Sequence, residues 1–348
     1  MHLYRQLQEL LATGERLALA TIIDQSGSGP RGPGAKMIRR KNGPTIGSIG
    51  GGILEAQVQR WAEEVLHTGQ PLCRQFTLTP NQAANSGMIC GGRLEILVDY
   101  FDGGDALHLQ LFSTISTLLN SRRRGCLITQ IIEAAGEIKT FHGLFSPGMP
   151  VFYSAEGGSD IPAELMPLTS LRQPSLCRSG NRRYFFEPLT PAPLVYIFGA
   201  GHISQKLVPL CRLVGFNTIV LDDRADFACP ENFPEADEIV VLDSWNQPQQ
   251  NRDLGADSFV VIVTRGHAHD QTVLARFLRS KVAYIGMIGS RHKRDTIYQN
   301  LLAQGFAGED LQRVFCPIGL SIGAETPEEI AVSIVAQLIA LRAGLSGQ

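Results

Sequence analysis

The residues from 193 to 224, PLVYIFGAGHISQKLVPLCRLVGFNTIVLDDR, constrain the fold more than any other part of the chain. An apolar strand leads into a glycine turn and a helix, and a second apolar strand then ends in acidic residues. This order within about thirty residues is typical of a dinucleotide-binding Rossmann unit. Gly199 permits the turn, and Gly201 lets a pyrophosphate approach the helix N-terminus. Ser204 stands where a third glycine is usual.

The acidic end of the second strand adds to this pattern. Asp222 lies 23 residues after Gly199, where a carboxylate meets a ribose hydroxyl in such units. Asp222 and Asp223 together should repel a 2′-phosphate, which argues against NADP more firmly than it argues for NAD. The alternative is a structural turn followed by a solvated aspartate.

Three more apolar strands follow, at 238–242, 258–264 and 283–289. Continuous apolar strands that alternate with helices indicate a parallel sheet covered on both faces. We therefore predict an α/β protein whose C-terminal domain is a Rossmann-like, doubly wound parallel sheet. The proline-rich joint at 189–193 separates a different α/β domain at 1–190 from this domain at 191–348.

Two of these strands end in unusually polar segments, VTRGHAHD and IGSRHKR. Ligands of open parallel sheets bind beyond the carboxyl ends of the strands, so we expect both segments to line one site rich in phosphate donors. His267 and His269, one residue apart, have no carboxylate pair or cysteine nearby to complete a metal site, which makes phosphate or base contact the preferred interpretation. The side chains and glycine expected here are Thr264, Arg265, His267, Asp270, Gly289, Ser290, Arg291 and Lys293.

A run of glycines, Gly50 to Gly52, precedes a predicted helix in the first domain. Glycine tolerates positive φ and lets a ligand come close to the backbone, and a helix start presents free N–H groups. The run therefore predicts an anion cradle, with a simple tight turn as the alternative. The first domain also suggests an internal duplication, because a helix and strand at 106–133 repeat the order of the first 24 residues. The glycine run occurs in the first copy only.

Composition excludes several classes of protein. With 31 basic and 33 acidic residues among 348, nothing suggests nucleic acid as a partner. No apolar run reaches the roughly 18 residues of a membrane helix, and the charged N-terminal helix lacks a signal-peptide stretch, so we expect a cytoplasmic protein. The seven cysteines form no CxxC pair. Cys90 precedes two glycines at a strand start, which favours an exposed, reactive thiol over a buried one.

Eight motifs in order resemble the XdhC/CoxI family of xanthine dehydrogenase accessory proteins. They are QSGSGPRGPGAKM, GSIGGGILE, CGGRLEI, FGAGHIS, DDR, TRGHAHD, YIGMIGSRHK and PIGLSIGAETPEEIA. The resemblance spans both ends of the chain and leaves only 105–190 without distinctive motifs. One departure is Ser321, because the family commonly has an aspartate there, so any role of a carboxylate at that position is in doubt.

The resemblance implies a maturation factor that binds molybdenum cofactor, protects it during sulfuration and delivers it to a molybdenum hydroxylase such as xanthine dehydrogenase. Such a factor is an accessory chaperone more than an enzyme, and a cysteine desulfurase and a second copy of the chain are further candidate partners. The residues expected to bind the cofactor or a nucleotide are Gly50, Gly51, Gly52, Glu55, Cys90, Gly199, Gly201, His202, Asp222, Asp223, Arg224, Thr264, Arg265, His267, Asp270, Gly289, Ser290, Arg291 and Lys293.

Two other functions fit a Rossmann domain. An NAD-dependent oxidoreductase would need a proton donor or acceptor beside its substrate, for which His267 or His202 is a candidate. A nucleotide-sensing regulatory module would need only binding and a moving interface. The fold does not separate these functions from a chaperone, and the sequence assigns no catalytic residue.

Overall fold

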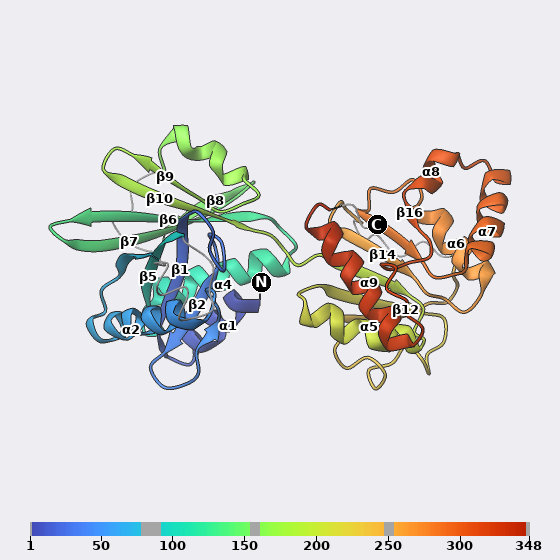
Figure 1. Cartoon of the computed structure of the whole chain (residues 1–348), viewed down its shortest axis with the longest axis horizontal. Coiled ribbons are helices and arrows are strands. Elements are labelled where there is room, and N and C mark those ends of the chain that lie inside the picture. Colours follow the sequence, from blue (N-terminus) through green and yellow to red (C-terminus); the bar gives the residue numbers. More distant parts are fainter. Residues whose placement is uncertain (1, 78–91, 154–160, 247–253, 346–348) are drawn as a thin grey trace. The chain divides into compact units, whose positions relative to one another are not determined.

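The computed structural model describes residues 2–77, 92–153, 161–246 and 254–345. The chain forms two compact units, Met1–Pro191 and Ala192–Gln348, and each has its own sheets and helices (Figure 1). No helix in these described ranges is both long enough and apolar enough to cross a bilayer.

The N-terminal unit contains two antiparallel sheets of five strands each. The first has the order β3-β2-β1-β5-β4 and the second the order β8-β7-β6-β10-β9. The strands of the first sheet are β1 (Arg16–Ser26), β2 (Lys36–Arg40), β3 (Ile46–Gly47), β4 (Leu72–Thr77) and β5 (Arg93–Asp102). Those of the second are β6 (Gly125–Ala134), β7 (Glu137–Ser146), β8 (Met149–Tyr153), β9 (Ser175–Ser179) and β10 (Arg182–Leu189).

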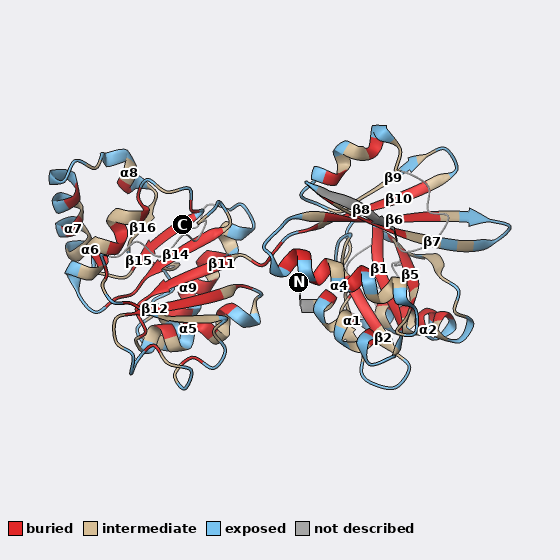
Figure 2. Cartoon of the chain, turned by 180° about the vertical axis from the view of Figure 1, so that it is seen from behind, coloured by how far each residue is buried: buried red, intermediate tan, exposed pale blue. Residues whose placement is uncertain are grey.

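The two sheets pack face to face, and helices cover their other surfaces (Figure 2). Leu19 of β1 and Leu127 of β6 belong to one apolar core between the sheets. Helices α1 (His2–Ala12) and α4 (Ala106–Asn120) pack against each other and close this core. The outer face of the first sheet is covered by α2 (Gly52–Thr68), and that of the second by the 3₁₀ helix η1 (Ala163–Ser170).

The expected internal duplication is confirmed by the topology. Each repeat runs helix, three strands, helix, two strands, and each first strand pairs with the second and fifth of its own repeat. Thus β1 corresponds to β6, β2 to β7 and β5 to β10. The repeats differ in their second helix, because the 17-residue α2 of the first is replaced by the eight-residue η1 in the second.

The C-terminal unit confirms the predicted doubly wound parallel sheet. Its six strands have the order β13-β12-β11-β14-β15-β16, and all neighbouring pairs are parallel. The strands are β11 (Leu194–Phe198), β12 (Asn217–Asp222), β13 (Glu238–Val241), β14 (Ser258–Ile262), β15 (Tyr284–Met287) and β16 (Val314–Phe315). β11 and β14 are buried along their whole length, as expected for central strands covered on both faces.

Helices cover both faces of this sheet. On one face lie α5 (His202–Leu213) and α9 (Pro327–Arg342), and on the other lie α6 (His267–Phe277), α7 (Arg291–Ala303) and the short α8 (Gly308–Gln312). The sequence specifies the start of α9 locally: Thr326 caps the Glu329 N–H, while the Glu329 carboxylate accepts from the Thr326 N–H at 3.1 Å.

Candidate functional site

The carboxyl ends of β11, β12, β14 and β15 form the strand-end site, which begins at the glycine turn after β11. Gly199 has φ of +114°, and a Cβ there would lie 2.3 Å from the Val263 carbonyl oxygen. Only glycine fits at this position. Gly201 is the N-cap of α5, and a Cβ on it would have no described atom within 4 Å. The first glycine is therefore required by the fold, whereas the second borders open space at a helix N-terminus.

Asp222 stabilises this turn through a hydrogen bond to its backbone. Its carboxylate accepts a hydrogen bond of 2.7 Å from the Ala200 N–H, and it accepts two bonds of 2.8 Å from the Arg224 guanidinium. Burial disfavours its charge, but the bonds from Arg224 and Ala200 outweigh that effect and hold the pKa of Asp222 below its usual value. The carboxylate expected to meet a ribose thus has protein partners, and its contact with a ribose stays a prediction.

Asp223 offers a different acceptor. Its Oδ2 accepts from Arg265 at 2.9 Å, while its Oδ1 is buried with no hydrogen-bond partner among the described residues. The expected repulsion of a 2′-phosphate loses its basis here, because Arg224 and Arg265 each neutralise one of the two aspartates. The sequence could not reveal this, because pairing of charges depends on side-chain placement rather than on residue counts.

A buried cluster joins β14 to α7. The Thr264 hydroxyl donates to Asp270 Oδ1 at 2.6 Å, and the Lys293 ammonium forms an ion pair with Asp270 Oδ2. Burial raises the pKa of Asp270 above its usual value, despite these two partners. Ser290 caps α7 by accepting from the Lys293 N–H at 3.2 Å. The structure therefore brings Thr264, Asp270 and Lys293 into contact, with Ser290 at the start of the helix that carries Lys293. The contact of these residues with a ligand stays a prediction.

The other predicted side chains at these strand ends are exposed. They are His202, Arg265, His267 and Arg291. A single pocket that contains both His267 and Arg291 stays a prediction. Trp245 is a residue near these strand ends that no motif predicted, and its ring stacks on His269 at 5.3 Å between centroids. Only its place after the strand β13 could have pointed to it.

Cys316, which follows β16, also belongs to no predicted site. Burial raises the pKa of this thiol to about 11, against the opposing charges of Arg294 and Lys293. A cavity of about 270 Å³ in this unit lies elsewhere and is lined by none of the predicted site residues. Its lining residues are Asn246, Gln271, Thr272, Ala275, Arg276 and Gln304.

Three motifs of the N-terminal unit converge at a second location, the glycine-loop site, formed by residues 27–34, 48–52 and Gly92. A Cβ on Gly50 would lie 2.4 Å from Pro30 Cγ, and a Cβ on Gly92 would lie 2.2 Å from the Ser28 carbonyl oxygen. These glycines thus allow the loops to touch. Cys90, the predicted reactive thiol, lies outside the described residues.

The amides of the glycine loop already have an internal acceptor. Glu55 Oε1 accepts from the Ser48 hydroxyl at 2.5 Å, from the Gly51 N–H at 3.0 Å and from the Ile49 N–H at 3.1 Å. Burial opposes ionisation of Glu55, but these hydrogen bonds lower its pKa. The expectation that the loop amides stand free for a cofactor is therefore wrong for Gly51, because an external anion there would have to replace Glu55.

In neither unit do three histidine, cysteine or acidic side chains of the described ranges gather closely enough to hold a metal ion. The candidate sites thus offer backbone amides, cationic side chains and the buried Oδ1 of Asp223. Such groups bind and orient an anionic, hydroxyl-bearing ligand.

Comparisons with known proteins agree with this architecture. Residues 195–338 match the XdhC Rossmann domain, and residues 10–79 match the XdhC and CoxI family. The chain is 28% identical over 348 residues to a probable xanthine dehydrogenase subunit of Bacillus subtilis, covering 97% of each chain. It is 19% identical over 336 residues to the molybdenum cofactor insertion chaperone PaoD of Escherichia coli, covering 96% of this chain and 86% of that protein.

A solved structure supports the relationship over the whole length. A Bacillus halodurans protein described as a xanthine dehydrogenase superposes with a TM-score of 0.79 and 28% sequence identity, covering 98% of this chain and 96% of that one. The two family matches fall on both units and include the glycine loop and the Rossmann turn. The chain belongs to the XdhC and CoxI family.

Proposed function

We propose that the protein is an accessory factor that binds molybdenum cofactor, protects it while its terminal sulfur ligand is installed, and delivers it to a molybdenum hydroxylase of the xanthine dehydrogenase type. The observation that carries this proposal is similarity across 96% of the chain to a molybdenum cofactor insertion chaperone. The similarity spans both units, so both candidate sites belong to the related region.

The strand-end site suits the phosphate or nucleotide end of the cofactor. Gly201 borders open space at the N-terminus of a 12-residue helix, where N–H groups favour an anion. The Lys293 ammonium lies at the same strand ends, where a phosphate would share it with the Asp270 carboxylate. Asp223 Oδ1 is buried with no donor among the described residues, and a ligand hydroxyl would satisfy it once this side chain turned toward the ligand. Together these groups fit a phosphorylated, polar ligand.

The glycine-loop site, considered by itself, suits a bulky ligand group such as a pterin. A Cβ on Gly51 would have no described atom within 4 Å, so the backbone there is open to a ligand. Glu55 occupies the nearest amides, which means that an anionic group binds here only by displacing its carboxylate. The cofactor, when bound, supplies the redox-active metal that the hydroxylase later uses. The residues of this chain would bind, orient and shield it.

Sulfuration and transfer complete the proposal. Cys90 stands two residues before Gly92 in the sequence. A thiolate at that position would contact the metal, or would attack the outer sulfur of a cysteine persulfide on a desulfurase partner, which forms a persulfide on Cys90 and releases the desulfurase thiolate. The remaining cofactor-site residues would hold the ligand until a hydroxylase accepts it.

Co-expression with a molybdenum hydroxylase tests the function directly. The purified protein is expected to carry pterin, detected by fluorescence after oxidation, and to raise hydroxylase activity in a cell extract. Gly201→Val should reduce ligand retention by roughly tenfold or more without unfolding, because the new side chain fills open space at the helix start. Cys90→Ala should lower hydroxylase activation, whereas Cys211→Ala, a change inside the core, should leave activation intact.

A protein that carries NAD without pterin and reduces it in the presence of a substrate would contradict the proposal and support the oxidoreductase alternative. Equal pterin retention by the wild type and Gly201→Val would remove the strand-end site from the binding surface. Activation by Cys90→Ala at the wild-type level would mean that the cofactor is held without this thiol.

A further inference from the structure

Three pairs of a basic and an acidic side chain cross the interior of the N-terminal unit, and each takes one member from each sheet. The Lys36 ammonium lies 2.5 Å from Glu187 Oε2, and His142 Nε2 lies 3.0 Å from Asp99 Oδ2. In the third pair, Arg183 Nη1 lies 2.5 Å from Glu95 Oε1. None of the six side chains is more than 18% exposed. Buried charges at this density are costly unless each is matched.

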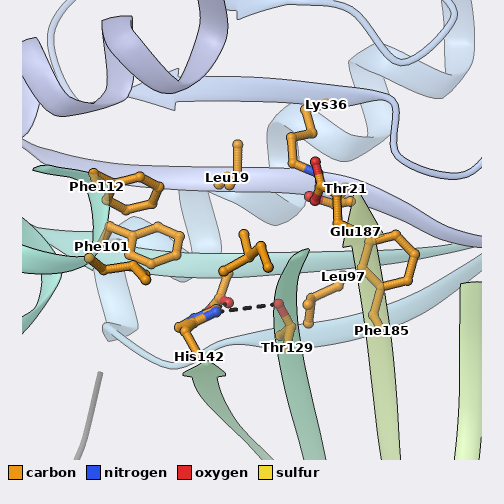
Figure 3. Close-up of a pocket in the computed structure, with 13 residues that line it drawn as sticks. Leu19, Thr21, Lys36, Leu97, Phe101, Phe112, Thr129, His142, Phe185 and Glu187 are labelled. Carbon is orange, nitrogen blue, oxygen red and sulfur yellow. Dashed lines mark hydrogen bonds and ion pairs between the residues drawn. The ribbon is translucent and has the colours of Figure 1, made fainter. Parts of the chain in front are cut away.

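Figure 3 shows the space between the first two pairs. Lys36 and Glu187 lie on one side of it, while His142 and Thr129 lie on the other. The cavity is about 20 Å³, room for roughly one water molecule. It is too small for a cofactor, so the reason for the charges lies in the packing of the sheets.

Strand register makes the two basic members equivalent. Lys36 of β2 lies opposite Thr21 of β1, and His142 of β7 lies opposite Thr129 of β6. Because β1 corresponds to β6 and β2 to β7, Lys36 and His142 occupy the same place in the two repeats. Tyr4 of α1 donates to Glu187 at 2.6 Å and adds to the first pair.

The acidic members are equivalent in the same way. Leu19 lies opposite Asp99, and Leu127 lies opposite Glu187. Asp99 and Glu187 therefore occupy equivalent positions in the two repeats. Each basic residue contacts the acidic residue of the other repeat: Lys36 contacts Glu187, and His142 contacts Asp99. This exchange is the pattern of an isologous twofold interface, here within one chain.

The third pair has a different geometry. Glu95 stands two residues before Leu97, which faces Thr21, and Arg183 stands two residues before Phe185, which faces Thr129. Glu95 and Arg183 are therefore equivalent positions that touch each other. Two copies of the first repeat would set Glu95 against another Glu95, and two copies of the second would set arginine against arginine. The crossed pairs impose no such penalty, because Lys36 would also match Asp99 of a like repeat.

We propose that the inner faces of the two repeats form a heterotypic association surface, in which the crossed pairs set the register and the Glu95–Arg183 contact selects the unlike partner. The partner that this surface fits is the other repeat. A like repeat is excluded by one pair of like charges in a buried position, which is how interfaces reject wrong partners. The role of Glu95 and Arg183 is selection, so their net effect on stability is small.

The test reverses the charges of Glu95 and Arg183 in the full chain, first one at a time and then together, and measures thermal unfolding. Glu95→Arg and Arg183→Glu each place like charges together and should lower the melting temperature of the N-terminal unit by roughly 10 °C or prevent folding. The double exchange, Glu95→Arg with Arg183→Glu, should restore a melting temperature within a few degrees of the wild type. Glu64→Arg, which breaks the exposed pair with Arg74, is the matched control and should have little effect.

A fourth variant separates selection from simple stabilisation. Glu95→Met with Arg183→Met removes both charges and should melt within a few degrees of the wild type, because apolar replacement of a buried ion pair is close to neutral. A double exchange no more stable than the single reversals would overturn the proposal. A double methionine variant as unstable as the single reversals would also overturn it, because the pair would then be a stabiliser.

Discussion

Asp222 receives four hydrogen bonds, from the Ala200 N–H and from the backbone and side chain of Arg224. They link the end of β12 to the glycine turn after β11, so one carboxylate fixes the geometry of the strand-end site. In this Rossmann unit, the acidic residue at the end of the second strand therefore holds the glycine turn in place. Its neighbour Asp223 presents an acceptor oxygen with no donor in the described part of the chain.

Asp222→Asn should therefore lower the stability of the C-terminal unit at neutral pH by about 1–3 kcal/mol, because the amide replaces the ionised acceptor of four hydrogen bonds. The folded-state pKa of Asp222 is lowered from 3.8. Its contribution is thus fully present above about pH 5 and is lost as the pH falls through the lowered folded pKa. Chemical denaturation at several pH values should show the gap between wild type and variant closing in acid. A gap that widens on acidification would contradict the assignment.

At this scale the sequence predicted backbone requirements better than side-chain partners. The turn at Gly199 and the helix start at Gly201 were predictable, because both depend on the spacing of glycines along the chain. The partners of Asp222, Asp270 and Glu55 depend on which side chains the fold brings within about 3 Å, and no spacing encodes that. The expectation of a free Gly51 N–H was wrong for this reason, because this N–H donates to the Glu55 carboxylate.

At the scale of elements, the start of α2 depends on glycines with unequal constraints. Gly50 and Gly51 have φ of +133° and +77°, so both backbones disfavour a side chain. Only Gly50 also lies against Pro30, where a Cβ would come within 2.4 Å of Cγ. The loop is held from one side by this contact and from the other by Glu55.

Gly50→Ala should consequently destabilise the N-terminal unit more than Gly51→Ala, by about 1–3 kcal/mol of additional loss. Both changes carry backbone strain, but only the first forces Pro30 to move. Urea unfolding of the two variants provides the comparison, and hydrogen exchange at the Ile49 and Gly51 amides reports whether the loop has opened. Equal losses would show that Pro30 gives way freely.

The order of elements in the C-terminal unit was predictable, because each parallel strand is buried on both faces and reads as a continuous apolar run. The N-terminal unit was harder to predict. Its repeat was visible as a recurring helix and strand, but the packing of two sheets face to face was not, since alternation along one strand does not reveal which surface covers it.

At the scale of the molecule, each unit closes its own apolar core. The two core clusters of the C-terminal unit consist only of residues from 194 to 341. Those of the N-terminal unit consist only of residues from 3 to 189. A unit that buries its own apolar surface has what it needs to fold independently.

Residues 192–348 expressed alone should accordingly fold, with helical circular dichroism and one cooperative melting transition. The same fragment with Gly199→Val should fail, because the added side chain would collide with the Val263 carbonyl. Failure of the unsubstituted fragment to fold would show that the apolar cores are insufficient by themselves.

The duplication of the N-terminal unit is uneven in one respect. The first repeat joins β1 to β2 through the long segment 27–35 and carries α2, whereas the second joins β6 to β7 by a tight turn at Ala135 and Gly136 and carries only η1. Exact twofold symmetry would give two equal binding places, yet in the described residues only the first repeat has a glycine loop with a full helix behind it. Calorimetric titration should therefore count one equivalent of cofactor per chain at this unit, with the second repeat serving as its fixed support.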